Sequence, residues 1–349
     1  MIIGGGSAGV AAAVSAAKSG KSVVLIDSHR YLGGSATASE VGTICGLFHQ
    51  QKTAIASYIV SGFAKDFAEK LKLRSNIDPI FNRDGLHYLP YSIEVYKSIC
   101  EDYLVEYGVT VFLESKIVDI DISNGVAKSC VIIQNEQVLA LNFDAIIDCS
   151  GKSIVSKLSN VPLIESQSFQ SAAMVFSMSN VFSENESSLN LLLIKNLSTA
   201  ISSGKLNEEF RKVFLVPGSL KHGNVSFKVG IPLEVTLSKD NVSELKQRGL
   251  QMIEALVSFL ITEVSVFAEA HLDHIAEDVG IRTDYRSEGH YILTEQDVLS
   301  CRKFENAVAD CSWPIEEWGN ELKVKMDFLP ENDFYQIPEE CLQSKHIHN

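Results

Sequence analysis

The 349-residue sequence lacks the closely spaced cysteines of metal or disulfide proteins. Without any CxxC pair, it cannot supply the clustered thiolates of an iron–sulfur or zinc site, and we expect no metal site. An odd number of scattered cysteines is typical of free thiols in a reducing compartment, so we expect a cytoplasmic location. The seven cysteines are Cys45, Cys100, Cys130, Cys149, Cys301, Cys311 and Cys341.

Clusters of positive charge are also missing. The 30 Lys and Arg residues are scattered along a chain with 44 Asp and Glu, which gives a formal net charge of −14. Such a surface repels phosphate backbones, so we expect no nucleic-acid partner. The most apolar internal stretch, 252–270, contains Glu254, Glu263 and Glu269. Three carboxylates at membrane depth are unfavourable, which predicts a soluble helix and no membrane partner.

The N-terminus is rich in glycine and alanine, and its pattern predicts a βαβ unit. Residues 1–3 are a short apolar strand, 7–19 an Ala-rich helix, and 22–26 a strand that is apolar on both faces. A strand of this kind is typical of a buried parallel sheet. The opening apolar residues lack a basic n-region, so we interpret them as structure and not as a signal peptide.

The turn between the first strand and the helix has the spacing of a dinucleotide-binding motif, GxGxxG, with Ser7 and Ala8 inside it. Gly4 permits the tight turn, Gly6 permits close approach to a pyrophosphate, and Gly9 permits close packing of helix and strand. The helix N-terminus favours the phosphate charge. Asp27 ends the second strand and is placed to accept hydrogen bonds from a ribose.

Paired glycines after the second strand favour FAD over NAD. Gly33 and Gly34, followed by Ser35, Ala36 and Thr37, allow a loop to lie flat along an extended dinucleotide. An NAD domain usually continues with another βα unit, and a plain glycine turn is the other alternative. We predict FAD as the cofactor.

The rest of the chain divides into three regions, and the predicted class is α/β. Region 1–159 is interpreted as a Rossmann-like FAD-binding domain, with a helix over 91–107 and a strand-rich insertion over about 109–142. Region 160–275 is interpreted as an inserted α+β substrate or cap domain with a long helix from about 240, and 276–349 as the return to the first domain. The helix places Ile253, Val257, Leu260, Val264 and Phe267 on one apolar face.

Two further segments give the sequence a resemblance to a known family. They are 143–151, which ends in Ser150-Gly151, and 280–299, with Arg282, Arg286, Gly289 and Tyr291. With the N-terminal unit, they resemble the FAD-dependent oxidoreductases of the glutathione-reductase-like superfamily, in particular the group related to the flavin-carrying polypeptide of heterodisulfide reductase. The resemblance implies that 143–151 passes by the flavin nucleotide.

The sequence departs from this family in two respects. Relatives continue into a closing segment that faces the flavin, so the resemblance implies a truncated C-terminus with this segment missing. Disulfide reductases of the superfamily have a CxxxxC pair after the paired glycines, whereas this chain has Cys45 alone there. Dithiol chemistry is therefore not expected, and we interpret Cys45 as a small core residue.

Catalytic candidates lie in the segment that carries the resemblance. Arg282 and Arg286 are four apart in a stretch that reads as extended, so one strand face would present both to an anion or to reduced flavin. Tyr291 is a candidate proton donor. His49, Tyr285 and His290 are weaker candidates of the same kind. Trp313 and Trp318 are expected to pack, and His346 and His348 are too few for a metal.

These features predict an FAD-dependent oxidoreductase that catalyses a two-electron, hydride-type reaction on an unidentified small-molecule substrate, with a further electron donor or acceptor. The alternative is a truncated, non-catalytic paralogue or binding subunit that does not retain FAD. An NAD(P)-dependent dehydrogenase is a second alternative.

Overall fold

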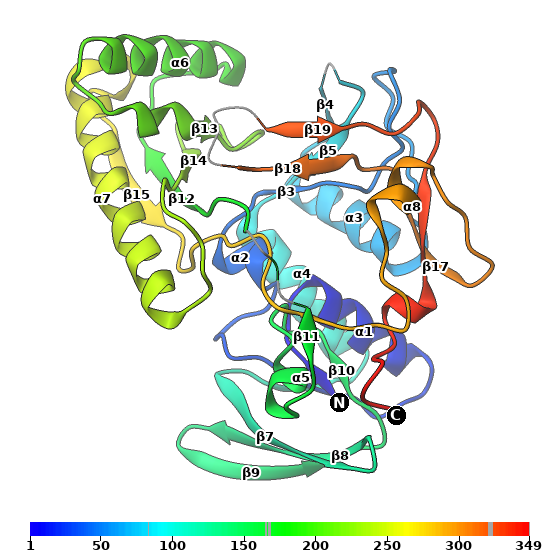
Figure 1. Ribbon diagram of the computed structural model, residues 1–349. Coiled ribbons are helices and arrows are strands. Elements are labelled where there is room, and N and C mark those ends of the chain that lie inside the picture. The colour runs from blue at the N-terminus through cyan, green and yellow to red at the C-terminus, as the bar shows by residue number, and fades with distance from the viewer. Residues whose placement is uncertain (83, 165, 167–168, 320–323, 349) are drawn as a thin grey trace.

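The chain forms two sheet-based units that lie side by side, as Figure 1 shows. The computed structural model describes residues 1–349 apart from 83, 165, 167–168, 320–323 and 349. Each unit has a hydrophobic core of its own.

The first unit is built on a parallel sheet. Strand β1 (Ile2–Ile3) lies between β10 (Ile147–Asp148) and β2 (Val24–Ile26), and β6 (Thr110–Phe112) follows β2. Helix α1 (Ser7–Lys18) makes the crossover from β1 to β2. Ile2 and Leu25 face one core and Ile3 and Ile26 the other, so both strands are apolar on both sides, which the sequence predicted for the second of them.

Helices cover one face of this sheet and a second sheet covers the other. Helices α3 (Gly62–Ser75) and α4 (Ile93–Glu106) pack with α1 on the first face, and Ser92 caps α4. The opposite face meets α5 (Ile154–Leu158) and the antiparallel strands β7 (Ser115–Ser123), β8 (Val126–Gln134) and β9 (Gln137–Asn142). These three strands lie within the predicted strand-rich insertion at about 109–142, whereas β6, at the start of that region, belongs to the parallel sheet.

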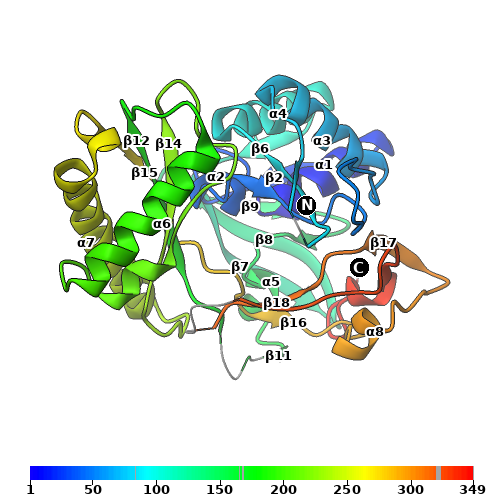
Figure 2. The ribbon, with the colours of Figure 1, turned by 90° about the horizontal axis from the view of Figure 1, so that it is seen from above.

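The second unit is an antiparallel sheet with helices on one side. Its strand order is β13 (Val213–Leu215), β14 (Val225–Gly230), β12 (Ala173–Ser179) and β15 (His271–Ile275). Helices α6 (Glu186–Ser202) and α7 (Lys239–Glu263) lie on its outer side in Figure 2. The predicted helix ends at Glu263, and Val264 and Phe267 are buried around the 3-10 turn η2 (Ser265–Phe267).

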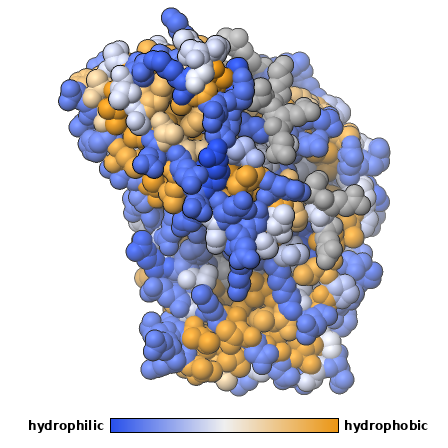
Figure 3. Space-filling model, turned by 60° about the vertical axis from the view of Figure 1, so that its left-hand side comes forward, coloured by the Kyte–Doolittle hydropathy of each residue, from blue (hydrophilic) through white to orange (hydrophobic). Residues whose placement is uncertain are grey.

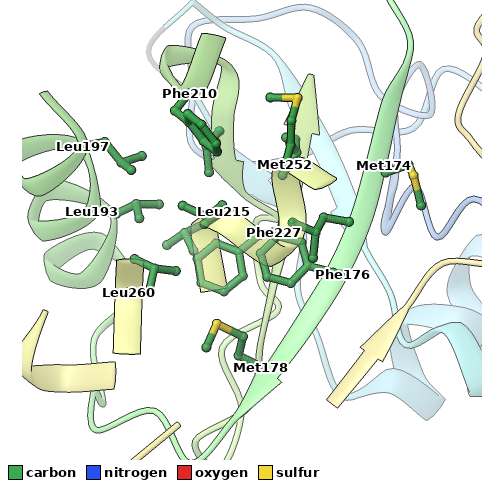
Figure 4. Packing of buried hydrophobic residues seen from close by; sticks show 14 of the residues in the cluster. Met174, Phe176, Met178, Leu193, Leu197, Phe210, Leu215, Phe227, Met252 and Leu260 are labelled. Atoms are coloured by element: carbon green, nitrogen blue, oxygen red, sulfur yellow. The ribbon is translucent and has the colours of Figure 1, made fainter. Parts of the chain in front are cut away.

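The core of this second unit is aromatic at its centre. Every second residue of β14 (Val225, Phe227 and Val229) is buried toward the helices, so the remaining residues point to the other face of the sheet. Phe227 stacks on Phe176 with ring centroids 5.0 Å apart. Figure 4 shows the two rings side by side among Leu215, Leu193 and Leu260, which come from a strand and both helices.

Shorter elements connect and border the two units. Between β2 and β6 are α2 (Ser35–Ala38), β3 (Thr43–Ile44), β4 (Ile80–Phe81) and β5 (His87–Pro90). Strand β11 (Leu163–Ile164) pairs with β16 (Arg286–Ser287), β17 (Ala307–Cys311) with β20 (Tyr335–Pro338), and β18 (Ile315–Glu317) with β19 (Lys325–Asp327). The others are η1 (Glu208–Lys212), α8 (Glu295–Leu299) and η3 (Glu339–Cys341). The predicted α/β class is confirmed.

Apolar side chains gather on the surface of the β7–β9 sheet. Val118, Ile133 and Val138 are exposed there. The lower part of the surface in Figure 3, where this sheet lies, is accordingly apolar, whereas much of the upper part is polar. Among the described residues, no helix combines the length and the hydropathy that a membrane crossing requires.

We expect Phe227→Ala to lower the free energy of unfolding by about 3–5 kcal/mol, because it opens a cavity in the centre of a closed core. Phe182→Ala is the matched control, since Phe182 is 68% exposed. Urea denaturation followed by circular dichroism measures both. Equal losses for the two variants would contradict the packing described.

Candidate functional site

Three neighbouring strands of the parallel sheet end at one edge, and the predicted nucleotide-binding residues lie there. Gly4 follows β1, Asp27 follows β2 and Cys149-Ser150 follows β10. Because β1 pairs in parallel with both other strands, these residues lie next to one another. In open α/β sheets, ligands bind at the carboxyl ends of the strands.

Gly4 and Gly9 are required by the packing of the chain itself. Gly4 has φ +100°, and a Cβ there would stand 2.4 Å from the Cys149 carbonyl oxygen. A Cβ on Gly9 would stand 1.8 Å from the Gly4 carbonyl oxygen, where α1 crosses the end of β1. Any side chain at either position would collide with backbone.

Gly6 differs, because the protein itself would accommodate a Cβ there. Its φ is −71°, and the nearest atom to an added Cβ is the Cα of Gly34 at 3.7 Å, an ordinary contact. Gly6 also precedes the first turn of α1, whose N–H groups favour an anion. The glycine therefore leaves a space beside the helix N-terminus that the fold does not need.

The paired-glycine loop lies against this turn. Gly33 donates its N–H to the Gly5 carbonyl at 2.8 Å, and Gly34, with φ +55°, approaches Gly6 so closely that a Cβ would be 2.9 Å from its Cα. Thr37 holds the loop by donating its hydroxyl to the Leu32 carbonyl at 2.7 Å. Ser35 and Ala36 begin helix α2 directly after the loop.

Asp27 anchors the glycine turn and is paired with a histidine. Its carboxylate accepts hydrogen bonds from the N–H groups of Gly5 and His29. The His29 ring lies between two carboxylates, with Nδ1 3.1 Å from Asp27 and Nε2 2.9 Å from Asp278. Hydrogen bonds to Asp27 and then to Asp278 raise the pKa of His29 to about 10, so the ring is an imidazolium at neutral pH.

Sequence reasoning placed Asp27 against a ribose and missed His29 and Asp278, which are 249 residues apart. The carboxylate already accepts donors of the chain itself, although its lone pairs allow further hydrogen bonds. Burial opposes the ionisation of Asp27, but the hydrogen bonds from His29 and Gly5 outweigh it and lower the pKa of Asp27.

Ser7, Ser150 and Gly151 complete the edge. The Ser7 hydroxyl lies 2.7 Å from the Tyr96 hydroxyl, which ties the start of α1 to α4. The Ser150 hydroxyl donates to Asp148 at 2.6 Å, and Gly151 has φ +69° with open space around it.

A second feature lies across the sheet of the other unit, on the face away from α6 and α7. There a cavity is lined by Lys212, Lys228 and Arg282 together with Phe214 and Trp318. The cavity is small, with a volume of about 20 Å³, and it opens to solvent. Gly280 bridges to Ala173 in the cavity wall and lies against Ser39, so the cavity is adjacent to the chain that leaves the paired-glycine loop.

Burial lowers the pKa of all three of these cations. Together with the charge of Arg282, burial lowers the pKa of Lys228 to about 8 and also lowers that of Lys212. Glu316 opposes this shift at Lys228, and its two oxygens accept the indole N–H groups of Trp313 at 3.0 Å and Trp318 at 2.8 Å. The tryptophans, predicted to pack, thus belong to a polar network.

The prediction that Cys45 is a core residue was wrong. The residue is exposed, directly after the short strand β3. Neighbouring parts of the chain still limit its contact with water, and this burial raises the pKa of Cys45 to about 12, with the charge of Glu316 adding to the rise. Cys45 is therefore an accessible but neutral thiol.

The expectation that Arg282 and Arg286 share a strand face was also wrong. Arg282 lies in a bend, donates to the Ser171 carbonyl and lies 4.4 Å from the centroid of the Trp318 ring. Arg286 lies in β16 and is exposed. Asp284 and Tyr285 between them do not extend the strand, so Arg282 joins lysines of the second unit and not Arg286.

Tyr291 belongs to a structural network. It donates its hydroxyl to Asp297 at 2.8 Å, and Asp297 closes the capping box of α8 with Thr294. Burial raises the pKa of Asp297, but hydrogen bonds from Thr294, Tyr291 and Arg302 outweigh burial and lower it. Neither Tyr291 nor Arg286 is among the described residues that line the cavity.

The weaker candidates lie apart from one another. His49 contacts Phe334, Tyr285 lies under the Lys157 ammonium, and His290 is exposed. The structure does not bring these three side chains together.

Comparison with known proteins now assigns the family. The model of the family described as FAD dependent oxidoreductase matches residues 1–349, the whole chain. The chain belongs to the FAD dependent oxidoreductase family. Its cofactor is FAD, as the sequence predicted. None of the curated proteins compared with the chain matches it.

Several solved structures are similar. A geranylgeranyl bacteriochlorophyll reductase-like protein from Thermoplasma acidophilum is 13% identical with a TM-score of 0.46, over 80% of this chain and 64% of its own. The p-nitrophenol 4-monooxygenase PnpA from Pseudomonas putida is 12% identical with a TM-score of 0.43, over 78% and 65%. The chain spans less than two thirds of the length of either protein. The assignment rests on the family match.

The residues at the sheet edge fit FAD. The space at Gly6 is next to the N–H groups of α1, where a pyrophosphate would be held, and the Gly33-Gly34 loop crosses directly above it. Gly4 and Gly9 permit the geometry of the turn. Gly6, which has no side chain, leaves room beside the N-terminus of α1 for a phosphate group.

The two kinds of glycine predict opposite phenotypes. Gly6→Ala is expected to keep the stability of the parent but to weaken FAD binding by about tenfold or more, because the methyl group stands where donors meet phosphate charge. Gly9→Ala is expected to lower the free energy of unfolding by about 1–3 kcal/mol by overpacking. FAD titration and urea denaturation measure the two effects. Parental FAD affinity in a folded Gly6→Ala variant would contradict the role of this turn.

The His29 pair predicts a pH dependence of stability. Because the pKa of His29 is about 10 when folded and 6.5 ordinarily, its contribution is complete below about 6.5 and is lost as the pH rises through about 10. His29→Gln should therefore show a smaller fall in the free energy of unfolding across this interval than the parent. His290→Gln, at an exposed position, is the control. Parallel curves for His29→Gln and the parent would contradict the bridge.

Proposed function

We propose that this protein catalyses a two-electron, hydride-type oxidation or reduction of a small molecule, with a further electron donor or acceptor to complete the cycle. Bound FAD supplies the electron-transfer chemistry, and the chain binds and orients it. The finer placement near the flavin-carrying polypeptide of heterodisulfide reductase is part of the proposal, and is supported by the motif at 280–299.

The observation that carries the proposal is the opening at Gly6 beside the N-terminus of α1. We propose that Gly6, Ser7, Ala8, Gly33 and Gly34 hold the pyrophosphate. Gly4 and Gly9 shape the turn, and Ser35, Ala36 and Thr37 continue the loop along the nucleotide. Asp27 contacts the ribose with its remaining lone pairs, and Ser150 and Gly151 border the flavin side.

We further propose that the second unit, within 160–275, is the substrate domain and that 276–349 returns to the FAD domain. The cationic cavity supports this, because it lies on the inner face of the second sheet and next to Ser39 and Gly280. Of the predicted catalytic residues, Arg282 lines this cavity. Arg286 and Tyr291 have their contacts elsewhere, Arg286 in the β11–β16 pair and Tyr291 at the start of α8.

The proposal predicts a protein that holds FAD and accepts two electrons per flavin. An absorbance spectrum of the purified full-length chain, release of the flavin by denaturation and an anaerobic titration with dithionite measure stoichiometry and electron uptake. A colourless protein that takes up no FAD on incubation would contradict the proposal and support the non-catalytic alternative. NAD(P) binding without flavin would support a dehydrogenase instead.

A further inference from the structure

The cavity beside Trp318 concentrates positive charge in an acidic protein. The chain has 44 acidic and 30 basic residues, yet Lys212, Lys228 and Arg282 line one cavity. Within the described part of the chain, none of the three forms an ion pair with a carboxylate, although other lysines and arginines do, such as Lys205 and Arg248. The cavity walls therefore carry positive charge that the described carboxylates do not pair.

These cations are held in place and still have donors to offer. Lys212 donates to the Gly319 carbonyl at 3.2 Å, and Arg282 donates to that of Ser171. Lys228 and Arg282 lie 4.7 and 4.4 Å from the centroid of the Trp318 ring. An ammonium has three N–H donors and a guanidinium five, so each keeps donors for a ligand.

The nearest described carboxylate, that of Glu316, does not accept hydrogen bonds from these cations. Glu316 acts on Lys228 and Arg282 only through its charge, because its two oxygens accept the indole N–H groups of Trp313 and Trp318. Burial and the charge of Arg282 disfavour the charged forms of Lys212 and Lys228. A bound anion would offset both effects, and two donors of this kind suit the two oxygens of a carboxylate.

We propose that this cavity binds the carboxylate of an organic-acid substrate, with Lys228 and Arg282 as its donors and Trp318 beside the body of the substrate. The inference deepens the proposed function and rests on it, since it names the substrate class of the same enzyme. Phe214, which also lines the cavity, adds apolar surface for the substrate.

The probe is benzoate, with the uncharged amide benzamide as its comparison. Trp313 and Trp318 are the two tryptophans of the sequence, and both donate to Glu316, so tryptophan emission reports directly on this cavity. We expect a saturable change in emission with benzoate, and about tenfold weaker binding or none with benzamide. An equal response to both compounds, or no response to benzoate, would overturn the proposal.

Substitutions of Lys228 test whether the cations cause the response of tryptophan emission to benzoate. Lys228→Met should weaken benzoate binding by about tenfold or more, and Lys228→Arg should restore most of it. Lys195→Met, on the exposed surface of α6, is the matched control and should bind as the parent does. Thermal unfolding shows whether each variant is folded. Parental affinity in a folded Lys228→Met variant would overturn the assignment.

The pH dependence of benzoate binding is an independent test of the role of Lys228. Because the pKa of Lys228 is lowered to about 8, benzoate binding should weaken as the pH rises through this value, and less so in Lys228→Arg. Arg282, Lys212, Glu316 and Cys45 are the titratable groups around Lys228 in the described structure. The same slope in the parent and in Lys228→Arg would contradict the role of Lys228.

Flavin absorbance is recorded on the same samples of the full-length chain. A missing flavin band refutes the proposed function, whatever the tryptophan signal shows. A normal flavin band that dithionite reduces, without a benzoate response, leaves the oxidoreductase in place and overturns the carboxylate site.

Discussion

The contact between the Gly4 carbonyl and Gly9 is the constraint on which the first unit depends. At this point α1 crosses the end of β1 so closely that the carbon of a single methyl group on Gly9 would lie 1.8 Å from the oxygen, a severe steric clash. The close crossing positions the N-terminus of α1 at the sheet edge, and it allows β1 to pair with β2 and β10 on either side. The nucleotide turn, the paired-glycine loop and Asp27 are all placed by this geometry.

Local patterns predicted the parts of the fold whose causes are local. The strand at 24–26 is apolar on both faces because a different core meets each face, and this is visible in its composition. The alternation of buried residues in β14 and the Ser92 cap at the start of α4 also have local causes in the sequence. Helices α3 and α6 were not predicted, because their many polar and exposed positions obscure the apolar stripe that packs against neighbours.

The nucleotide turn could be found from the sequence, whereas the cationic cavity could not. GxGxxG is contiguous, and each glycine has a separate physical reason. Lys212, Lys228 and Arg282 come from η1, β14 and the bend after β15, and only the folded sheet brings them together. The alternation of 225–230 does place Lys228 on the face opposite the core, but no local signal says that Arg282 lies there. For the same reason, proximity in sequence wrongly grouped Arg282 with Arg286.

The pair between His29 and Asp278 also has a consequence for how the chain is made. The glycine turn and His29 leave the ribosome well before Asp278, the second carboxylate of the pair, which is 249 residues further along the chain than His29. Until Asp278 has emerged, only one side of the ring is paired, and the βαβ unit lacks its link to the segment that follows the second unit. Closing a contact of such sequence separation is slow relative to local folding. The nucleotide pocket is therefore completed long after its glycine turn has been synthesised.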